Sequence, residues 1–162
     1  MQHNGEKTYG GFAMKNQRNL GNIVPLSDEG LEKVAGGYNG EVISSGSFSS
    51  QTGTSLNMLV SWTAVADAFG QKTLYVTVSS TSYSLYSAAN ANSLELNVNG
   101  MTYTATPNAV NYDGGVLATH TLAGFTIPNA FGPASISAAW HFNGVISGVP
   151  VGTIWASGVA NF

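Results

Sequence analysis

Beyond residue 37 the sequence alternates between apolar and polar side chains over a series of short stretches. In the first of them every second side chain is apolar, and most side chains between are serine, threonine or asparagine. A period of two residues is typical of a β-strand with one buried face. No stretch of this region keeps the period of a helix. The pattern therefore predicts strands within residues 56–66, 73–79, 94–98, 101–105, 116–122 and 136–142.

Glycine-containing pairs between these stretches predict the turns. Asn99-Gly100 lies between two alternating stretches, which is the strongest short signal of a β-hairpin. Asn143-Gly144 and Asp113-Gly114-Gly115 predict two further turns. Because turn signals recur at short intervals and helical periods are missing, we expect an all-β fold.

The first and last parts of this region are harder to place. Residues 44–50 form a serine-rich, low-complexity run, which we expect to be flexible. A final strand is expected over residues 151–162, where Ile154 and Trp155 compete for the inner face. With this strand included, we predict an antiparallel β-sandwich of about eight strands, immunoglobulin-like or jelly-roll-like. A short helical or disordered leader precedes it.

Charge divides the 162-residue chain into two unequal parts. Eight of the 13 charged residues lie in the first 37 positions, and past them one lysine, no arginine and four carboxylates give a net charge of −3. Nucleic-acid binding and a polybasic membrane-surface patch are excluded, because both need several cations. The longest apolar runs are three or four residues, so no membrane-spanning helix is expected. The outward faces also lack the lysines that usually guard strand edges.

The segment before residue 38 has the features of an export leader. Ser27 is placed as a helix N-cap, and two acidic residues follow it in the first turn. Leu31 and Val34 share one face of that helix, and the pair Gly36-Gly37 ends it. An alternative is a short amphipathic helix that docks on the following domain.

Leu26, Leu31, Val34, Gly36 and Gly37 are spaced as in the double-glycine leaders of bacteriocins and related exported peptides. Residues 14–37 resemble those leaders, which an ABC transporter with a cysteine-protease domain recognises and cleaves after the second glycine. The resemblance implies a leader over residues 1–37, with Met14 as an alternative start. It also implies a single mature domain over residues 38–162 that is secreted or held at the extracellular surface.

Four segments of the mature region occur in a characteristic order: Ser61-Trp62, the hairpin within 94–103, Trp140–Gly144 and Ala156–Val159. In this order residues 55–162 resemble the immunoglobulin-like modules of tail structural proteins from phages of Gram-positive bacteria. The resemblance implies a sandwich used for display or attachment, and it assigns no functional residue. Likeness of fold alone does not establish function.

Candidate catalytic groups past residue 37 are few. No motif joins any two of the carboxylates, whereas glycoside hydrolysis needs a pair about 5–9.5 Å apart. His120 is on the same strand face as core positions, so we expect it to be buried and hydrogen-bonded. His141 is on the outward face of its strand. Two histidines without a third ligand make no zinc site. Nucleophile and phosphate-loop motifs are missing, as is cysteine. We expect no enzymatic activity, cofactor or metal. The carboxylates are Glu41, Asp67, Glu95 and Asp113, of which Glu95 is expected on a solvated strand face and Asp113 in a turn.

Aromatic side chains are the remaining candidates for function. Tyr75, Tyr86, Tyr112 and Trp155 are out of step with the inner face of their strands or lie beside turns. An exposed ring stacks on the C–H face of a sugar or on another subunit, and neighbouring amides and hydroxyls bind sugar hydroxyls without charge. We therefore expect a secreted, non-enzymatic binding or adhesion module for a neutral glycan or cell surface. A self-assembling surface or filament protein is the alternative, and a bacteriocin-like antibacterial effector is a weaker one.

Overall fold

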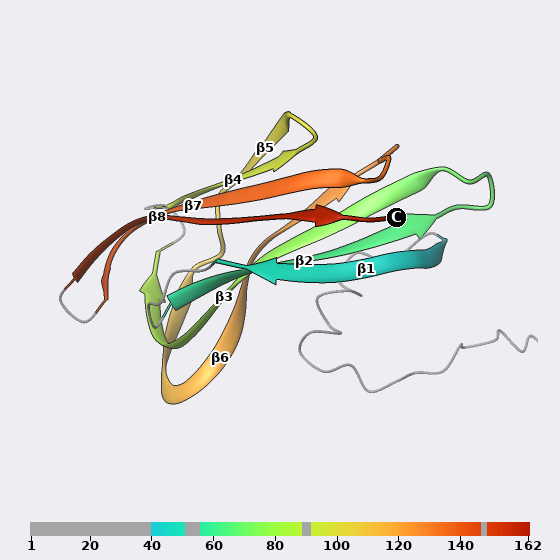
Figure 1. Cartoon of the computed structure of the whole chain (residues 1–162). Helices are drawn as coiled ribbons and strands as arrows, with labels where there is room; N and C mark the ends of the chain where they lie inside the picture. The colour runs from blue at the N-terminus through green and yellow to red at the C-terminus, as the bar shows by residue number, and fades with distance from the viewer. Residues whose placement is uncertain (1–39, 51–55, 89–91, 147–148) are drawn as a thin grey trace, which may run out of the picture.

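The structure, a computed structural model, describes residues 40–50, 56–88, 92–146 and 149–162 (Figure 1). The expected leader and its cleavage position lie outside the described residues. Eight strands make up most of the described chain, as the alternation predicts. They are β1 (Glu41–Ser49), β2 (Leu56–Ala66), β3 (Lys72–Ser87), β4 (Ser93–Val98), β5 (Met101–Ala105), β6 (Val110–Ile127), β7 (Ala134–Ile146) and β8 (Val149–Ala160).

The strands form two antiparallel four-stranded sheets that pack into a β-sandwich, which confirms the predicted fold class. One sheet has the order β1-β2-β3-β6 and the other the order β5-β4-β7-β8. The chain crosses between the sheets from β3 to β4, from β5 to β6 and from β6 to β7. Within the sheets β3 pairs with β6, and β4 pairs with β7. No helix long and apolar enough to cross a membrane is found among the described residues.

The core lies between the inner faces of the two sheets. The central strands supply fully buried leucines, valines and isoleucines at every second position, so the alternation seen in the sequence is the alternation between core and surface. Trp140 is the largest fully buried side chain, and its ring lies 4.8 Å from that of Phe142. This buried layer fixes which side chains point outward.

One predicted turn is confirmed, and two are wrong. Asn99 and Gly100 both have positive φ and join β4 to β5, as a tight hairpin turn requires. Asn143-Gly144 instead lies within β7, where the pairing with β8 shifts register between His141 and Gly144. Asp113-Gly114-Gly115 lies within β6, and the register shift opposite Ser82 and Ser84 leaves residues 114–117 outside the ladder. Both glycine segments are bulges in long strands, and β6 bends sharply in Figure 1.

The ends of the domain also differ from expectation. The serine-rich run expected to be flexible belongs to β1, which pairs with β2 from Glu41 to Ser49. Of the two β8 residues that could occupy the inner face, Ile154 is buried and Trp155 is 61% exposed. Ile154 pairs with the core residue Trp140, so placing it inward completes the core.

The free edges of the sheets are protected without lysine. β5 is only five residues long, and short edge strands offer little backbone for pairing. The outer edge of β6 is covered at one point by Asn108, whose backbone N–H donates to the Leu122 carbonyl (2.7 Å) and whose side-chain Nδ2 donates to the Thr121 carbonyl (3.2 Å).

The edges of β1 and β8 lie against each other, which closes one side of the sandwich. Ser44 Oγ donates a hydrogen bond to the Asn161 carbonyl (2.7 Å) across this seam. Gly158 leaves room for the Phe48 ring, because a Cβ at Gly158 would lie 2.5 Å from Phe48 Cδ1. The seam therefore depends on a glycine in β8 facing an aromatic ring in β1.

We expect Gly158→Ala to weaken the seam. The added methyl would displace the Phe48 ring, and overpacking of this kind costs about 1–3 kcal/mol of unfolding free energy. Urea denaturation measures the loss. Gly152→Ala in the same strand is the control, because its Cβ would meet nothing within 4 Å; equal stability of the two variants would contradict the packing described.

Candidate functional site

The outward side chains of β5, β4, β7 and β8 form straight rows across their sheet, because the four strands pair in register. The first row, called here the Trp155 row, ends on the indole. The adjacent row, called the Asn97 row, is polar throughout. In strand order the Trp155 row is Thr104, Glu95, Ala139 and Trp155, and the Asn97 row is Thr102, Asn97, Ser137 and Ser157.

A hollow of about 120 Å³ lies between Trp155 and Glu95. Its floor is Ala139, whose side chain is too small to fill the space between the two larger neighbours in its row. Asn97, Thr102 and Ser137 of the adjacent row complete the lining. The hollow thus combines an exposed indole, one carboxylate and three neutral hydrogen-bonding side chains.

A hydrogen bond and a histidine–carboxylate contact bring polar side chains together beside this hollow. His141 Nδ1 shares a hydrogen bond with Thr153 Oγ1 (3.0 Å), and His141 Nε2 lies 3.6 Å from Glu95 Oε1. The imidazole also approaches Trp155 edge-on, with ring centroids 6.5 Å apart. His141 therefore contacts the side chains of both Glu95 and Trp155, which border the hollow.

A second hollow, of about 400 Å³, lies on the other side of Trp155. It is lined by Ser137, Trp155, Ala156 and Ser157 of the same sheet and by Ser49 of β1. Ser49 reaches this position because β1 packs along β8 at the seam. Trp155 and Ser137 line both hollows, so the two are neighbours across the indole.

The four aromatic residues singled out in the sequence do not form one surface. Tyr75, Tyr86 and Tyr112 belong to the β1-β2-β3-β6 sheet, and Trp155 belongs to the other. Tyr75 is half-buried, and the Tyr112 hydroxyl donates to the Val116 carbonyl (2.8 Å). These two rings contribute to the structure of their own sheet.

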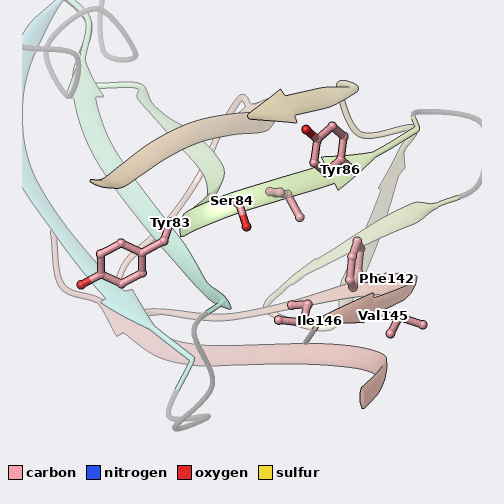
Figure 2. Close-up of a pocket in the computed structure, with 7 residues that line it drawn as sticks. Tyr83, Ser84, Tyr86, Phe142, Val145 and Ile146 are labelled. Carbon is pink, nitrogen blue, oxygen red and sulfur yellow. The ribbon is translucent and has the colours of Figure 1, made fainter. Parts of the chain in front are cut away.

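Tyr86 is 66% exposed and borders a different hollow, of about 310 Å³, between the ends of β3 and β7. Figure 2 shows its ring on β3 above Phe142, Val145 and Ile146 of β7, whereas the Tyr83 ring extends away from them. The lining carries no charged side chain. Much of the wall is core, since Leu85 and Phe142 are only 3% exposed.

The carboxylates past residue 37 lie on different elements of the described structure. Glu95 is half exposed on its strand, as expected, and Asp113 is exposed in the β6 bulge. Asp67 Oδ1 accepts hydrogen bonds from the backbone N–H groups of Phe69 and Gln71 (2.8 Å each), which stabilises the β2–β3 turn. No group of three potential metal ligands occurs among the described residues.

His120 is partly buried, and its ring lies 4.7 Å from that of Tyr112. The expected hydrogen bond to the ring is missing at Nε2, which is buried without a partner in the described part of the chain.

Comparison with known proteins adds no identity: no family model matches the chain, and no curated protein or solved structure shows significant similarity to it. The outer face of the β5-β4-β7-β8 sheet therefore provides the evidence for function by its geometry.

The sequence pattern singles out Trp155 as a candidate but not the residues around it. Asn97, Thr102 and Ser137 have no distinguishing motif, and they come together with Trp155 only through the register of strands far apart in the chain. The available signal was the outward alternation of each strand. Alternation gives the face of a residue and leaves its cross-strand neighbours undetermined.

We expect Trp155 to supply the quenchable part of the tryptophan fluorescence. The chain has three tryptophans, and Trp62 and Trp140 are 7% and 0% exposed. Iodide should quench the wild-type protein, and Trp155→Phe should abolish most of that quenching. Iodide titration of both proteins tests this, and quenching that persists in the variant would show that another indole is accessible.

Proposed function

We propose that the domain is an exported, non-enzymatic module that binds a neutral glycan through the outer face of the β5-β4-β7-β8 sheet. The observation that carries the proposal is the 61% exposed Trp155 beside a shallow hollow lined by Glu95, Asn97, Thr102 and Ser137. Protein surfaces often expose apolar residues singly. Here the exposed indole has ordered polar side chains beside it.

The composition of the hollow favours sugars over other ligands. An indole offers an apolar, polarisable face to sugar C–H groups, and the amide and hydroxyl groups supply neutral hydrogen bonds to sugar hydroxyls. The only basic side chain past residue 37 apart from histidine is Lys72, and its Nζ lies 5.6 Å from the centroid of the Phe162 ring. Anionic glycans would therefore find no lysine or arginine at this hollow.

Export is the second part of the proposal, and the spacing of Leu26, Leu31, Val34 and Gly36-Gly37 supports it. We expect the secreted protein to begin at Tyr38, because double-glycine leaders are removed after the second glycine. Mass spectrometry of the protein from the culture medium of a host with a leader-processing transporter measures this start. Replacement of Gly37 by Ile should block cleavage, since a β-branched side chain would not enter a narrow protease cleft. An unprocessed wild-type protein in the medium would contradict the assignment.

Glycan binding is tested by retention of the purified full-length chain on insoluble neutral polysaccharides and on Gram-positive cell walls. We expect one of these to retain the protein, and Trp155→Ala to weaken binding at least tenfold, which corresponds to about 1.4 kcal/mol. Tyr86→Ala is the matched control, because it removes an equally exposed aromatic ring from the other sheet. Equal retention of Trp155→Ala and wild type would overturn the site.

Self-assembly is the second candidate, favoured by the absence of any charged residue from the edge strand β5. Size-exclusion chromatography of the input in the retention assay separates the two candidates. A retained monomer supports glycan binding, and large species without retention support assembly through strand edges.

A further inference from the structure

We infer that the site takes an internal stretch of a linear neutral glycan, several sugar units long, lying across the strands of the sheet. This inference rests on the proposed function and specifies its ligand. A site for a single terminal sugar would need only the hollow over Ala139. Two hollows flank Trp155, and the geometry makes them parts of one track.

The Asn97 row runs through both hollows. Thr102, Asn97 and Ser137 line the hollow over Ala139, and Ser137 and Ser157 line the hollow toward β1. The row is continuous because each member pairs in register with the next. Three strand spacings of about 4.8 Å place its ends roughly 14 Å apart, which exceeds the width of one sugar ring.

Polar groups are available along the whole track. At one end Asn97 Nδ2 donates to Thr102 Oγ1 (3.1 Å), and Asn97 Oδ1 accepts from the Gly100 backbone N–H (3.0 Å). These two bonds orient the amide, and its second N–H and the second lone pair of its oxygen can bind a ligand. At the other end Ser157 and Ser49 contribute hydroxyl groups from two different sheets. Trp155 borders both hollows from β8, where its ring can stack on a sugar unit.

The position of the track in the sheet also favours an internal stretch of polymer. β5 is the edge strand of its sheet, so the Asn97 row ends at a free edge beyond Thr102. A polymer can continue past this edge. The only carboxylate in the lining is Glu95, and no lysine or arginine lines either hollow, so a polymer of uronic acids is disfavoured.

The test measures affinity against ligand length. Cello-oligosaccharides and chito-oligosaccharides of one to six units are titrated into the full-length chain by calorimetry, with oligogalacturonate as the anionic comparison. We expect affinity for one neutral series to rise at least tenfold between one and four units and then to level off. Oligogalacturonate should not bind.

Two variants test the two halves of the track separately. Thr102→Gln fills the hollow over Ala139, and Ser157→Gln fills the hollow toward β1. Each should lower affinity for the six-unit ligand at least fivefold. Val159→Gln is the matched control, because Val159 is an exposed residue of the same strand and face that lines neither hollow. Unchanged melting temperatures confirm that the variants are folded.

The outcomes separate this inference from the function on which it rests. Length-independent affinity that Trp155→Ala abolishes and Ser157→Gln leaves intact would overturn the extended track and keep a single-sugar site. Absence of binding by both neutral series, or binding that Trp155→Ala leaves unchanged, would overturn the inference together with the proposed site.

Discussion

The cross-strand register of the β5-β4-β7-β8 sheet is the constraint on which the candidate site depends. A slip of one residue in β8 would turn Trp155 into the core and Ile154 to the surface, because side chains alternate strictly between faces. The register is held at one end by paired hydrogen bonds: Asn99 N–H donates to the Ser135 carbonyl (3.0 Å), and Ser135 N–H donates to Asn99 Oδ1 (2.8 Å). Ile154 also stabilises this register, because a pairing shifted by one residue would remove its side chain from the core beside Trp140.

The scarcity of charge shapes both the stability of the domain and the chemistry available to it. Outer faces made of serine, threonine and asparagine remain hydrated without ion pairs, so their recognition of a partner must use stacking and neutral hydrogen bonds. In the lining of the hollow over Ala139, Glu95 is the one carboxylate, and its Oε1 lies 3.6 Å from His141 Nε2. Because charged residues are few, the strand edges have little protection from lysine. They are protected instead by the β1–β8 seam, by the short length of β5 and by the hydrogen bonds from Asn108 to β6.

Much of the fold could be predicted from the sequence, because alternation and an Asn-Gly hairpin are local signals. The β-sandwich and the Asn99-Gly100 turn are confirmed on that basis. Local signals failed where tertiary pairing decides the outcome. Asn143-Gly144 has the composition of a turn, yet pairing with β8 continues beyond it, and the glycine is accommodated as a bulge. The serine-rich β1 has little propensity of its own and is a strand because it pairs with β2 and packs along β8.

Exposure alone does not select the candidate site, since several other large apolar side chains are also on the surface. Phe69 is 90% exposed, more than Trp155, but it lies in the β2–β3 turn, where Asp67 fixes the backbone, and it lines neither of the two hollows beside Trp155. Trp155 differs because it rises from a rigid sheet whose register supplies a small floor residue, Ala139, and a polar row beside it. A ring held by a sheet loses little entropy on stacking, whereas a ring in a turn must first be ordered. The neighbours of the indole, rather than its exposure, distinguish a binding surface from an ordinary exposed aromatic residue.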